Sequence, residues 1–316
     1  MADGKWIEGL APEMEVPVAA REVLIARFQV VRHFLPLAVV KSYQDPEFVH
    51  QLRVSTRRAA AALRVFGDCL PRKHLKAAKD SLRMIRRAAA DARDWDVFLL
   101  ALPNAKSLTS ALGKPALDFL SGYAMGEREA AQARLVEASN SASPRFSEES
   151  EHLPEFVHDF KGDNSPDSFG DLAASQLGAL LSSLNSAARK SPTSPQELHQ
   201  LRILGKRVRY SLEIFVDCFP DFFKESLYPA VEQVQEMLGE IQDAAVGLVR
   251  LRGLRDHIKK TIPAEWPRIR KGFEGLMQSM RAKIPAGRKA FQKWRKGWLE
   301  LVEGLKVETA LAVVTA

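Results

Sequence analysis

Apolar residues recur at spacings of three and four along nearly the whole chain, and runs of strict apolar–polar alternation are scarce. This periodicity predicts amphipathic α-helices rather than strands. Helix breakers separate the periodic segments, in the stretches SYQDPE, LPR, LPN, KSPTSPQE and TIPAEWP. We therefore expect an all-α fold of antiparallel helical bundles.

Two of the expected helices repeat each other. The stretch HQLRVSTRRAAAALRVFGDCLP, which begins at His50, aligns without a gap with HQLRILGKRVRYSLEIFVDCFP, which begins at His199, at an offset of 149 residues. Ten of the 22 aligned positions are identical. A proline precedes each copy where a helix would begin, and Ser194 and Glu197 form the pattern of a capping box. The repeat predicts two helical halves packed around a pseudo-twofold axis.

The polar positions of the repeated helix form a basic stripe, separate from its apolar stripe. In the first copy the stripe holds His50, Arg53, Arg57 and Arg64, with Arg58 beside it; in the second copy it holds His199, Arg202, Lys206 and Arg209, with Arg207 beside it. Like charges at these spacings repel by a few tenths of a kcal/mol each. No Asp or Glu lies between Glu47 and Asp68 to relieve the repulsion. A solvated helix face explains one such stripe, but two in register favour an anion bound along them.

A further basic face is expected on the helix that follows the first copy. Its cations recur at spacings of three, four and seven, at Lys76, Lys79, Arg83, Arg86 and Arg93. The corresponding part of the second half lacks these charges, so the site is expected to be asymmetric. Asp94 and Asp243 correspond at the same offset, and we expect them to orient basic side chains or cap a helix rather than bind a metal.

The net charge of +7 understates how basic the expected helical body is. Residues 146–171 hold eight Asp or Glu and one Lys, a net of −7, so the remaining residues carry +14. The enclosing stretch 139–170 is rich in Ser, Pro and acids and is predicted to be a linker, partly disordered. It is either a solubilising loop or an acidic arm that competes for the basic site. The basic remainder favours an anionic partner.

These residues resemble the CHAD family, the conserved histidine α-helical domain. The signatures are VHQLRVSTRRAAAALRVF with ARDWDVFL in the first half, and LHQLRILGKRVRYSLEIF with LGEIQDAAV in the second; together they cover roughly 15–305. Where relatives tend to carry Leu-Gly before the first RD-x-D motif, this chain has Ala89-Ala90. The expected halves span 15–138 and 171–308, between tails at 1–14 and 309–316.

The resemblance implies two four-helix bundles with a basic channel between them. It implies non-catalytic binding of inorganic polyphosphate and an association with polyphosphate granules. Carried over position by position, it implies ligand contacts at His50, Arg53, Arg57, Arg58, His199, Arg202, Lys206 and Arg207.

Two other functions would use the same charges. Single-stranded nucleic acid is bound by cations interleaved with stacking aromatics, and the basic faces at 50–64 and 72–93 contain no Phe, Tyr or Trp. The C-terminal run RKAFQKWRKGW does interleave them, and is expected to be an amphipathic packing helix. A metal-dependent phosphohydrolase would gather the histidines with Asp91, Asp94 and Asp96 around a divalent ion, but their spacing is loose. We expect no metal, no cofactor and no catalysis.

Location and redox state follow from composition. No stretch approaches the roughly 18 unbroken apolar residues of a membrane span, and the N-terminus lacks the order of a signal peptide. We therefore expect a cytoplasmic protein, with its oligomeric state left open. The only two cysteines, Cys69 and Cys218, are expected to be small buried hydrophobes near helix ends.

Overall fold

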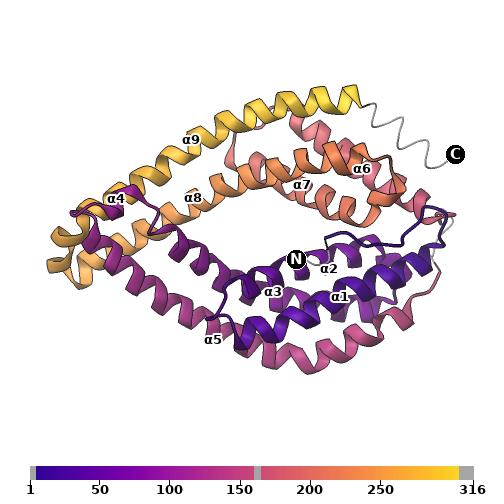
Figure 1. Cartoon of the computed structure of the whole chain (residues 1–316), viewed down its shortest axis with the longest axis horizontal. Helices are drawn as coiled ribbons and strands as arrows, with labels where there is room; N and C mark the ends of the chain where they lie inside the picture. Colours follow the sequence, from indigo (N-terminus) through magenta and orange to yellow (C-terminus); the bar gives the residue numbers. More distant parts are fainter. Residues whose placement is uncertain (1–4, 160–164, 306–316) are drawn as a thin grey trace.

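The computed structural model describes residues 5–159 and 165–305, and the regular elements of these two ranges are all helical (Figure 1). The first half is a four-helix bundle of α1 (Val16–Val40), α2 (Glu47–Val65), α3 (Arg72–Ala101) and α5 (Lys114–His152). Helix α1 packs against α2 and α5, and α3 packs against the same two helices. The short helices η1 (Gly67–Cys69) and α4 (Lys106–Thr109) lie in the connections.

The second half repeats this order of elements. It contains α6 (Phe169–Arg189), α7 (Pro195–Phe215), α8 (Tyr228–Thr261) and α9 (Trp266–Gly304). Short helices η3 (Val216–Cys218), η4 (Phe223–Leu227) and η5 (Pro263–Glu265) connect them. Helices α5 and α9, the last of each half, both have 39 residues.

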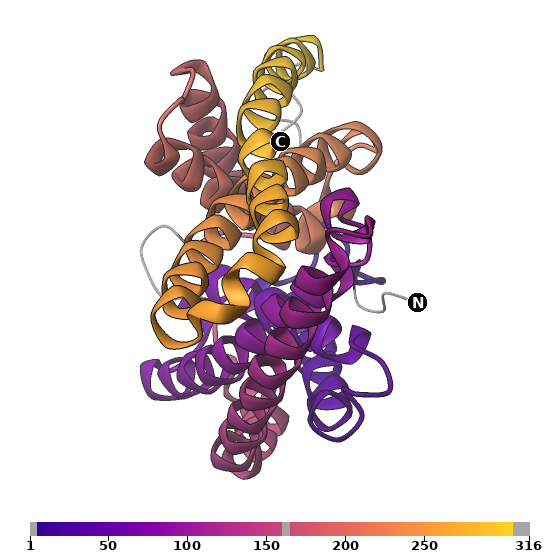
Figure 2. The same cartoon turned by 90° about the vertical axis from the view of Figure 1, so that its left-hand side faces the viewer.

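The two halves meet at the repeated helices. Helix α2 packs against α7, and at one end of the molecule α4 and α5 pack against α9. Figure 2, which views that end, shows the start of α5 beside α9. Gly272 of α9 allows this close approach, because a Cβ atom there would lie 2.8 Å from the carbonyl oxygen of Gly113.

The start of α7 is capped as the sequence predicts. The Ser194 hydroxyl accepts a hydrogen bond from the Glu197 amide at 3.2 Å, and the Glu197 carboxylate accepts one from the Ser194 amide at 2.9 Å. At the first copy, Asp45 accepts from the Glu47 amide at 2.8 Å. These bonds satisfy amide groups that a helix leaves without partners in its first turn.

The stretch predicted as a linker is largely helical at its start. Helix α5 continues to His152, and η2 (Leu153–Phe156) follows and packs against α1. Phe146 and Leu153 are buried in the core, and this burial outweighs the poor helix propensity of the surrounding serines. Residues 160–164 of the predicted linker, and the terminal residues 1–4 and 306–316, lie outside the described residues.

Two local predictions concern buried side chains. Cys69 and Cys218 are free and buried, as expected, and burial raises the pKa of the Cys69 thiol to about 11. Trp294 and Trp298 of the C-terminal run are buried, which confirms a packing helix. The Trp294 indole donates to the carbonyl oxygen of Ala230 at 2.7 Å.

Helix α1 is the one described helix long and apolar enough to cross a membrane, judged by length and composition. It packs against α2 and α5, and it carries the buried side chain of Arg27. Core helices of globular proteins pass the same test, so this helix is weak evidence for a membrane span.

Candidate anion-binding groove

Residues from both halves line a cavity of about 490 Å³ near the crossing of α2 and α7. Cations enter it from α2, α7, α8 and α9, carboxylates from α3 and α8, and apolar side chains from α3, α8 and α9; the lining includes Arg53, Arg57, Asp94, Val97, Phe98, Arg202, Glu240, Asp243, Val246, Arg250, Met280 and Lys283. Arg202 also lines an adjoining cavity of about 120 Å³, together with His199 and Arg288. The repeated helices therefore bring their basic stripes to one place.

Asp94 and Asp243, which correspond in the two halves, line the cavity beside the basic stripes, as does Glu240. Nη1 of Arg53 donates to Oδ1 of Asp94 at 3.1 Å, which confirms the prediction that Asp94 orients a basic side chain. Burial raises the pKa of Asp243, against the opposing charge of Arg202. These two acids offset only part of the positive charge around them.

The crowding of cations is strongest at Lys206. Burial, followed by the charges of Arg57 and Arg202, lowers its pKa to about 7. The Nε atoms of Arg53 and Arg202 are buried without a hydrogen-bond partner among the described residues. A buried donor without an acceptor destabilises the folded protein. An anion in the cavity would accept hydrogen bonds from both atoms.

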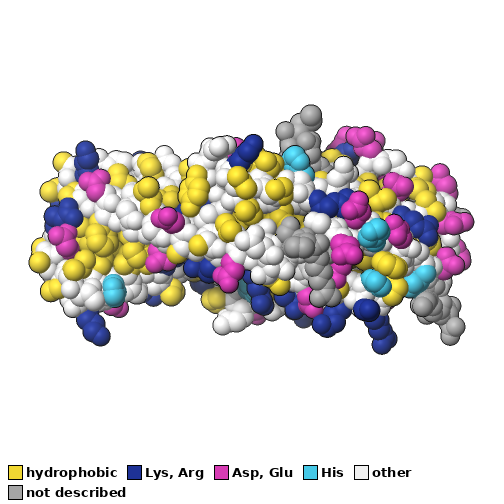
Figure 3. All heavy atoms as spheres, turned by 90° about the horizontal axis from the view of Figure 1, so that it is seen from below, with side chains coloured by type: hydrophobic (Ala, Val, Ile, Leu, Met, Phe, Trp, Pro, Cys, Tyr) yellow, Lys and Arg dark blue, Asp and Glu magenta, His cyan; other side chains and the backbone are white. Residues whose placement is uncertain are grey.

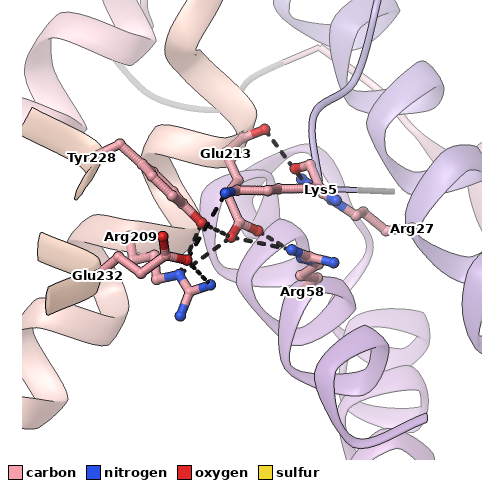
Figure 4. A network of polar contacts seen from close by, with 7 residues as sticks. All are labelled: Lys5, Arg27, Arg58, Arg209, Glu213, Tyr228 and Glu232. Carbon is pink, nitrogen blue, oxygen red and sulfur yellow. Dashed lines mark hydrogen bonds and ion pairs between the residues drawn. The ribbon is translucent and has the colours of Figure 1, made fainter. Parts of the chain in front are cut away.

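Arg58, predicted to contact the ligand, is instead part of a buried ion pair between the halves (Figure 4). Its Nε donates to Oε2 of Glu213 at 2.7 Å and its Nη2 to Oε1 at 3.3 Å. The Arg58 side chain is 6% exposed and that of Glu213 is fully buried. The structure corrects the prediction because Arg58 lies beside the basic stripe, on the side of α2 that faces α7.

Arg209 belongs to the same network and not to the cavity. Its Nη2 donates to Glu232 at 2.7 Å and its Nε to the hydroxyl of Tyr228 at 2.9 Å. The Tyr228 hydroxyl in turn donates to Oε1 of Glu213 at 2.7 Å. The nearby Arg27 guanidinium donates to the backbone carbonyl of Glu213 at 3.1 Å (Figure 4).

The offset of 149 residues makes position 58 equivalent to 207 and position 64 equivalent to 213. Where Arg58 meets Glu213, the equivalent pair is therefore Arg207 and Arg64, two cations. Partial burial, followed by the charges of Arg207 and Arg86, lowers the pKa of Arg64. In the described part of the chain, neither Arg64 nor Arg207 forms an ion pair. The contact between Arg58 and Glu213 is thus a salt bridge. The equivalent contact, between Arg207 and Arg64, has two cations and no carboxylate.

We use the name basic groove for the surface that these cations share. It comprises the cavity residues His199, Arg202, Arg53 and Arg57, together with four cations whose charges act on them or on one another, Lys206, Arg64, Arg86 and Arg207. Arg57 joins its two ends, because its charge acts on Lys206 and also on Arg86. His50 lies along it, and burial, followed by the charge of Arg93, lowers the pKa of His50.

Helix α3 contributes fewer cations to the basic groove than the sequence predicts. Lys76 and Arg83 are exposed and pair with Asp80 on their own helix, at 3.0 and 3.6 Å. Lys79 is half-buried at the start of the same helix. Arg86 and Arg93 do reach the charges of the basic groove: burial and then Arg57 lower the pKa of Arg86, and the charge of Arg93 acts on His50. Figure 3, which views the molecule from the side of the first bundle, shows Lys and Arg side chains gathered along one edge of that face.

Several cavity residues lie outside every stripe that the sequence analysis identified. Arg250 of α8 stacks on the Trp95 ring, with its guanidinium carbon 3.9 Å from the ring centroid. Lys283 and Arg288 come from α9. No periodic pattern signals them, because they reach the cavity only through the packing of α8 and α9 against the rest of the fold.

The acids considered for a metal site lie apart from one another. Asp91 is exposed beside Arg134, and Asp96 pairs with the buried Arg128 on the other side of α3 from Asp94. In the ranges that the structure describes, no group of three or more His, Cys, Asp or Glu is placed to hold a metal ion.

Comparisons with known proteins agree on one fold. The family model described as the CHAD domain matches residues 23–252. The crystal structure of the CHAD domain from the plant Ricinus communis matches with a TM-score of 0.71 and 23% identity, over 92% of this chain and 95% of that chain. PptA from Streptomyces chartreusis matches with a TM-score of 0.67 and 18% identity, over 90% of this chain and 100% of that chain. No curated protein matches the sequence. At these identities the two structures show a shared fold.

Proposed function

The chain belongs to the CHAD family, and from this premise we propose that it binds inorganic polyphosphate in the basic groove. One observation carries the proposal. Six cations of the basic groove, contributed by both halves, form no ion pair within the described residues; they are Arg57, Arg64, Arg86, Arg202, Lys206 and Arg207. A fold that holds so many like charges together is stabilised when a polyanion lies among them.

The chemistry of the groove suits a polymer of phosphates. Each repeating unit of polyphosphate carries about one negative charge and has no base to read, so binding rests on charge and counterion release. The guanidinium group binds two phosphate oxygens at once, and arginine supplies most of the groove's cations. The buried Nε donors of Arg53 and Arg202 would gain acceptors in the same step.

We propose that this binding is not catalytic. Asp94, a carboxylate beside the stripes, is held by Arg53 at 3.1 Å and so acts as a positioning group. Binding of this kind would keep the protein in the cytoplasm at polyphosphate granules.

Titration calorimetry tests the proposal. Long-chain polyphosphate and single-stranded DNA of equal total charge are titrated into the protein at near-physiological salt. The variant Arg57→Gln with Arg202→Gln removes two charged hydrogen-bond donors, and we expect it to bind polyphosphate about 100-fold more weakly. The control, Lys260→Gln with Lys271→Gln, removes the same charge from exposed positions near the turn between α8 and α9.

The outcomes separate a dedicated site from a general basic surface. Binding that prefers polyphosphate and is lost only in the groove variant supports the proposal. Equal affinity for DNA, or equal losses in the two variants, would overturn it and indicate a surface that attracts any polyanion.

A further inference from the structure

A third cavity, of about 310 Å³, lies outside the basic groove, between α3, α5 and the turn that joins α1 to α2. Its lining residues are Ser42, Tyr43, Pro46, Asp96, Leu99, Leu100, Met125, Arg128 and Glu129. Asp96 follows Asp94 by two residues on α3, a rotation of about 200°. The two carboxylates therefore serve opposite sides of the helix, and Asp94 alone faces the basic groove.

Two buried polar atoms of this cavity have no hydrogen-bond partner among the residues that the structure describes. They are Oγ of Ser42 and Oδ2 of Asp96, in residues that are 3% and 6% exposed. Buried polar atoms in folded proteins are nearly always satisfied. A carboxylate oxygen only accepts, so the missing group at Asp96 is a donor.

Hydrogen bonds hold the other polar side chains beside this cavity in place. Oδ1 of Asp96 already accepts from Nε of Arg128 at 2.5 Å, and Nη1 of Arg128 donates to Gln132 at 2.9 Å. The Gln132 amide in turn donates to the backbone carbonyl of Ala38 at 3.0 Å. This chain of bonds fixes the Asp96 carboxylate and leaves Oδ2 as the free acceptor, so the site is preorganised.

The walls are apolar and the local charge is negative. Tyr43, Leu100 and Met125 are 69%, 57% and 62% exposed, although they are large apolar side chains gathered around one cavity. Asp96 and Glu129 outweigh Arg128 in the lining, in a chain whose net charge is +7. The cavity therefore favours a ligand with an apolar body and a positively charged end.

We propose that this cavity binds a small organic amine. The ammonium group donates to Oδ2 of Asp96 and Oγ of Ser42, which are the two acceptors without partners. An ammonium carries three donors and no acceptor, so it can donate to both of these oxygen atoms. The body lies against Leu99, Leu100 and Met125, next to the Tyr43 ring, which already has the Arg128 guanidinium over it. The site is independent of polyphosphate binding.

The test uses the full chain and three probes of similar shape: 2-phenylethylamine, 2-phenylethanol and 3-phenylpropanoate. Saturation-transfer NMR and calorimetry measure their binding. We expect the amine to bind at least about tenfold more tightly than the alcohol, because a charge-assisted hydrogen bond is the stronger one. The carboxylate should not bind.

Two variants locate the site. Leu100→Trp fills the mouth of the cavity at an exposed position, so the protein keeps its fold while amine binding is lost. Ser42→Ala removes one acceptor and should weaken the binding of the amine more than the binding of the alcohol. Asp118→Asn, at an exposed carboxylate of α5 outside the cavity, is the matched control and should bind the amine as the unmodified protein does.

Three results would overturn the proposal: equal binding of the amine and the alcohol, equal binding by the protein and Leu100→Trp, or no binding up to millimolar amine. In the last case water alone satisfies Asp96. Polyphosphate affinity should be the same in all three variants, so failure here leaves the proposed function untouched.

Discussion

The unequal contacts at positions 58 and 64 lead to a charge-reversal prediction. Glu213 neutralises Arg58 in one half, whereas Arg64 occupies the equivalent position opposite Arg207. The substitution Arg64→Glu would give Arg207 the carboxylate that Arg58 already has. We expect this single change to make the protein more stable and a weaker binder of polyphosphate.

The stability gain should be modest. Arg64 and Arg207 are exposed, whereas Arg58 and Glu213 are buried, and exposed ion pairs contribute only about 0.2–1 kcal/mol. Removal of the repulsion between two arginines adds a few tenths of a kcal/mol. For a chain of this size, about 1 kcal/mol raises Tm by roughly 2–4 °C.

The loss of binding should be larger. The substitution removes one phosphate contact and adds a negative charge at the end of the basic groove. Each contact contributes about 0.7 to the slope of log K against log salt for single strands. We expect affinity to fall at least about tenfold, and the slope to become shallower by roughly one unit.

Thermal unfolding and polyphosphate titrations at several salt concentrations measure both effects. Arg64→Gln removes the cation without supplying a partner and should not raise Tm as much. Lys260→Glu makes the same change in charge at an exposed site far along α8. The reasoning is refuted if Arg64→Glu lowers Tm, or if Lys260→Glu weakens binding equally.

Three further predictions follow from the groove and the buried network. First, the six cations without ion pairs predict a log–log salt slope of about −4, so polyphosphate affinity should fall roughly 300-fold between 50 and 200 mM salt; a flat dependence in titrations at several salt concentrations would contradict it. Second, a bound anion should return the pKa of Lys206 from about 7 toward its usual 10.5, so between these values the complex holds more protons than the free protein. Affinity should then fall as pH rises above 7, and calorimetry at pH 8 in buffers of different ionisation enthalpy should detect proton uptake that Lys206→Arg abolishes. Third, Glu213→Gln should cost about 3–5 kcal/mol of unfolding free energy by leaving Arg58 buried without its partner, whereas Glu274→Gln, at the exposed pair with Arg270, should cost under about 1 kcal/mol in the same urea titration.

Local patterns were sufficient for the helices and for most of the groove. Periodicity and capping are properties of neighbouring residues, so the starts of α2 and α7 and the capping box at Ser194 could be predicted. The stripe residues Arg53, Arg57, Arg202 and Lys206 do converge, because the two helices that repeat the basic stripe pack against each other.

Those local patterns could not predict the contacts between the halves. Arg58 and Arg207 are equivalent in sequence, yet one is buried against Glu213 and the other is exposed near Arg64. In each case the residue on the opposite half makes the difference: Glu213 lies beside Arg58, whereas Arg64 lies near Arg207. Arg250 and Arg288 likewise reach the cavities only through the packing of α8 and α9.

The sequence by itself determined which segments are helical, which two repeat, and which faces of the repeated helices are basic. The tertiary structure decided which arginines remain available to a ligand. The physical reason is that the pairing of a charge depends on the nearest opposite charge in space, whereas periodicity along one helix specifies only the direction in which a side chain points.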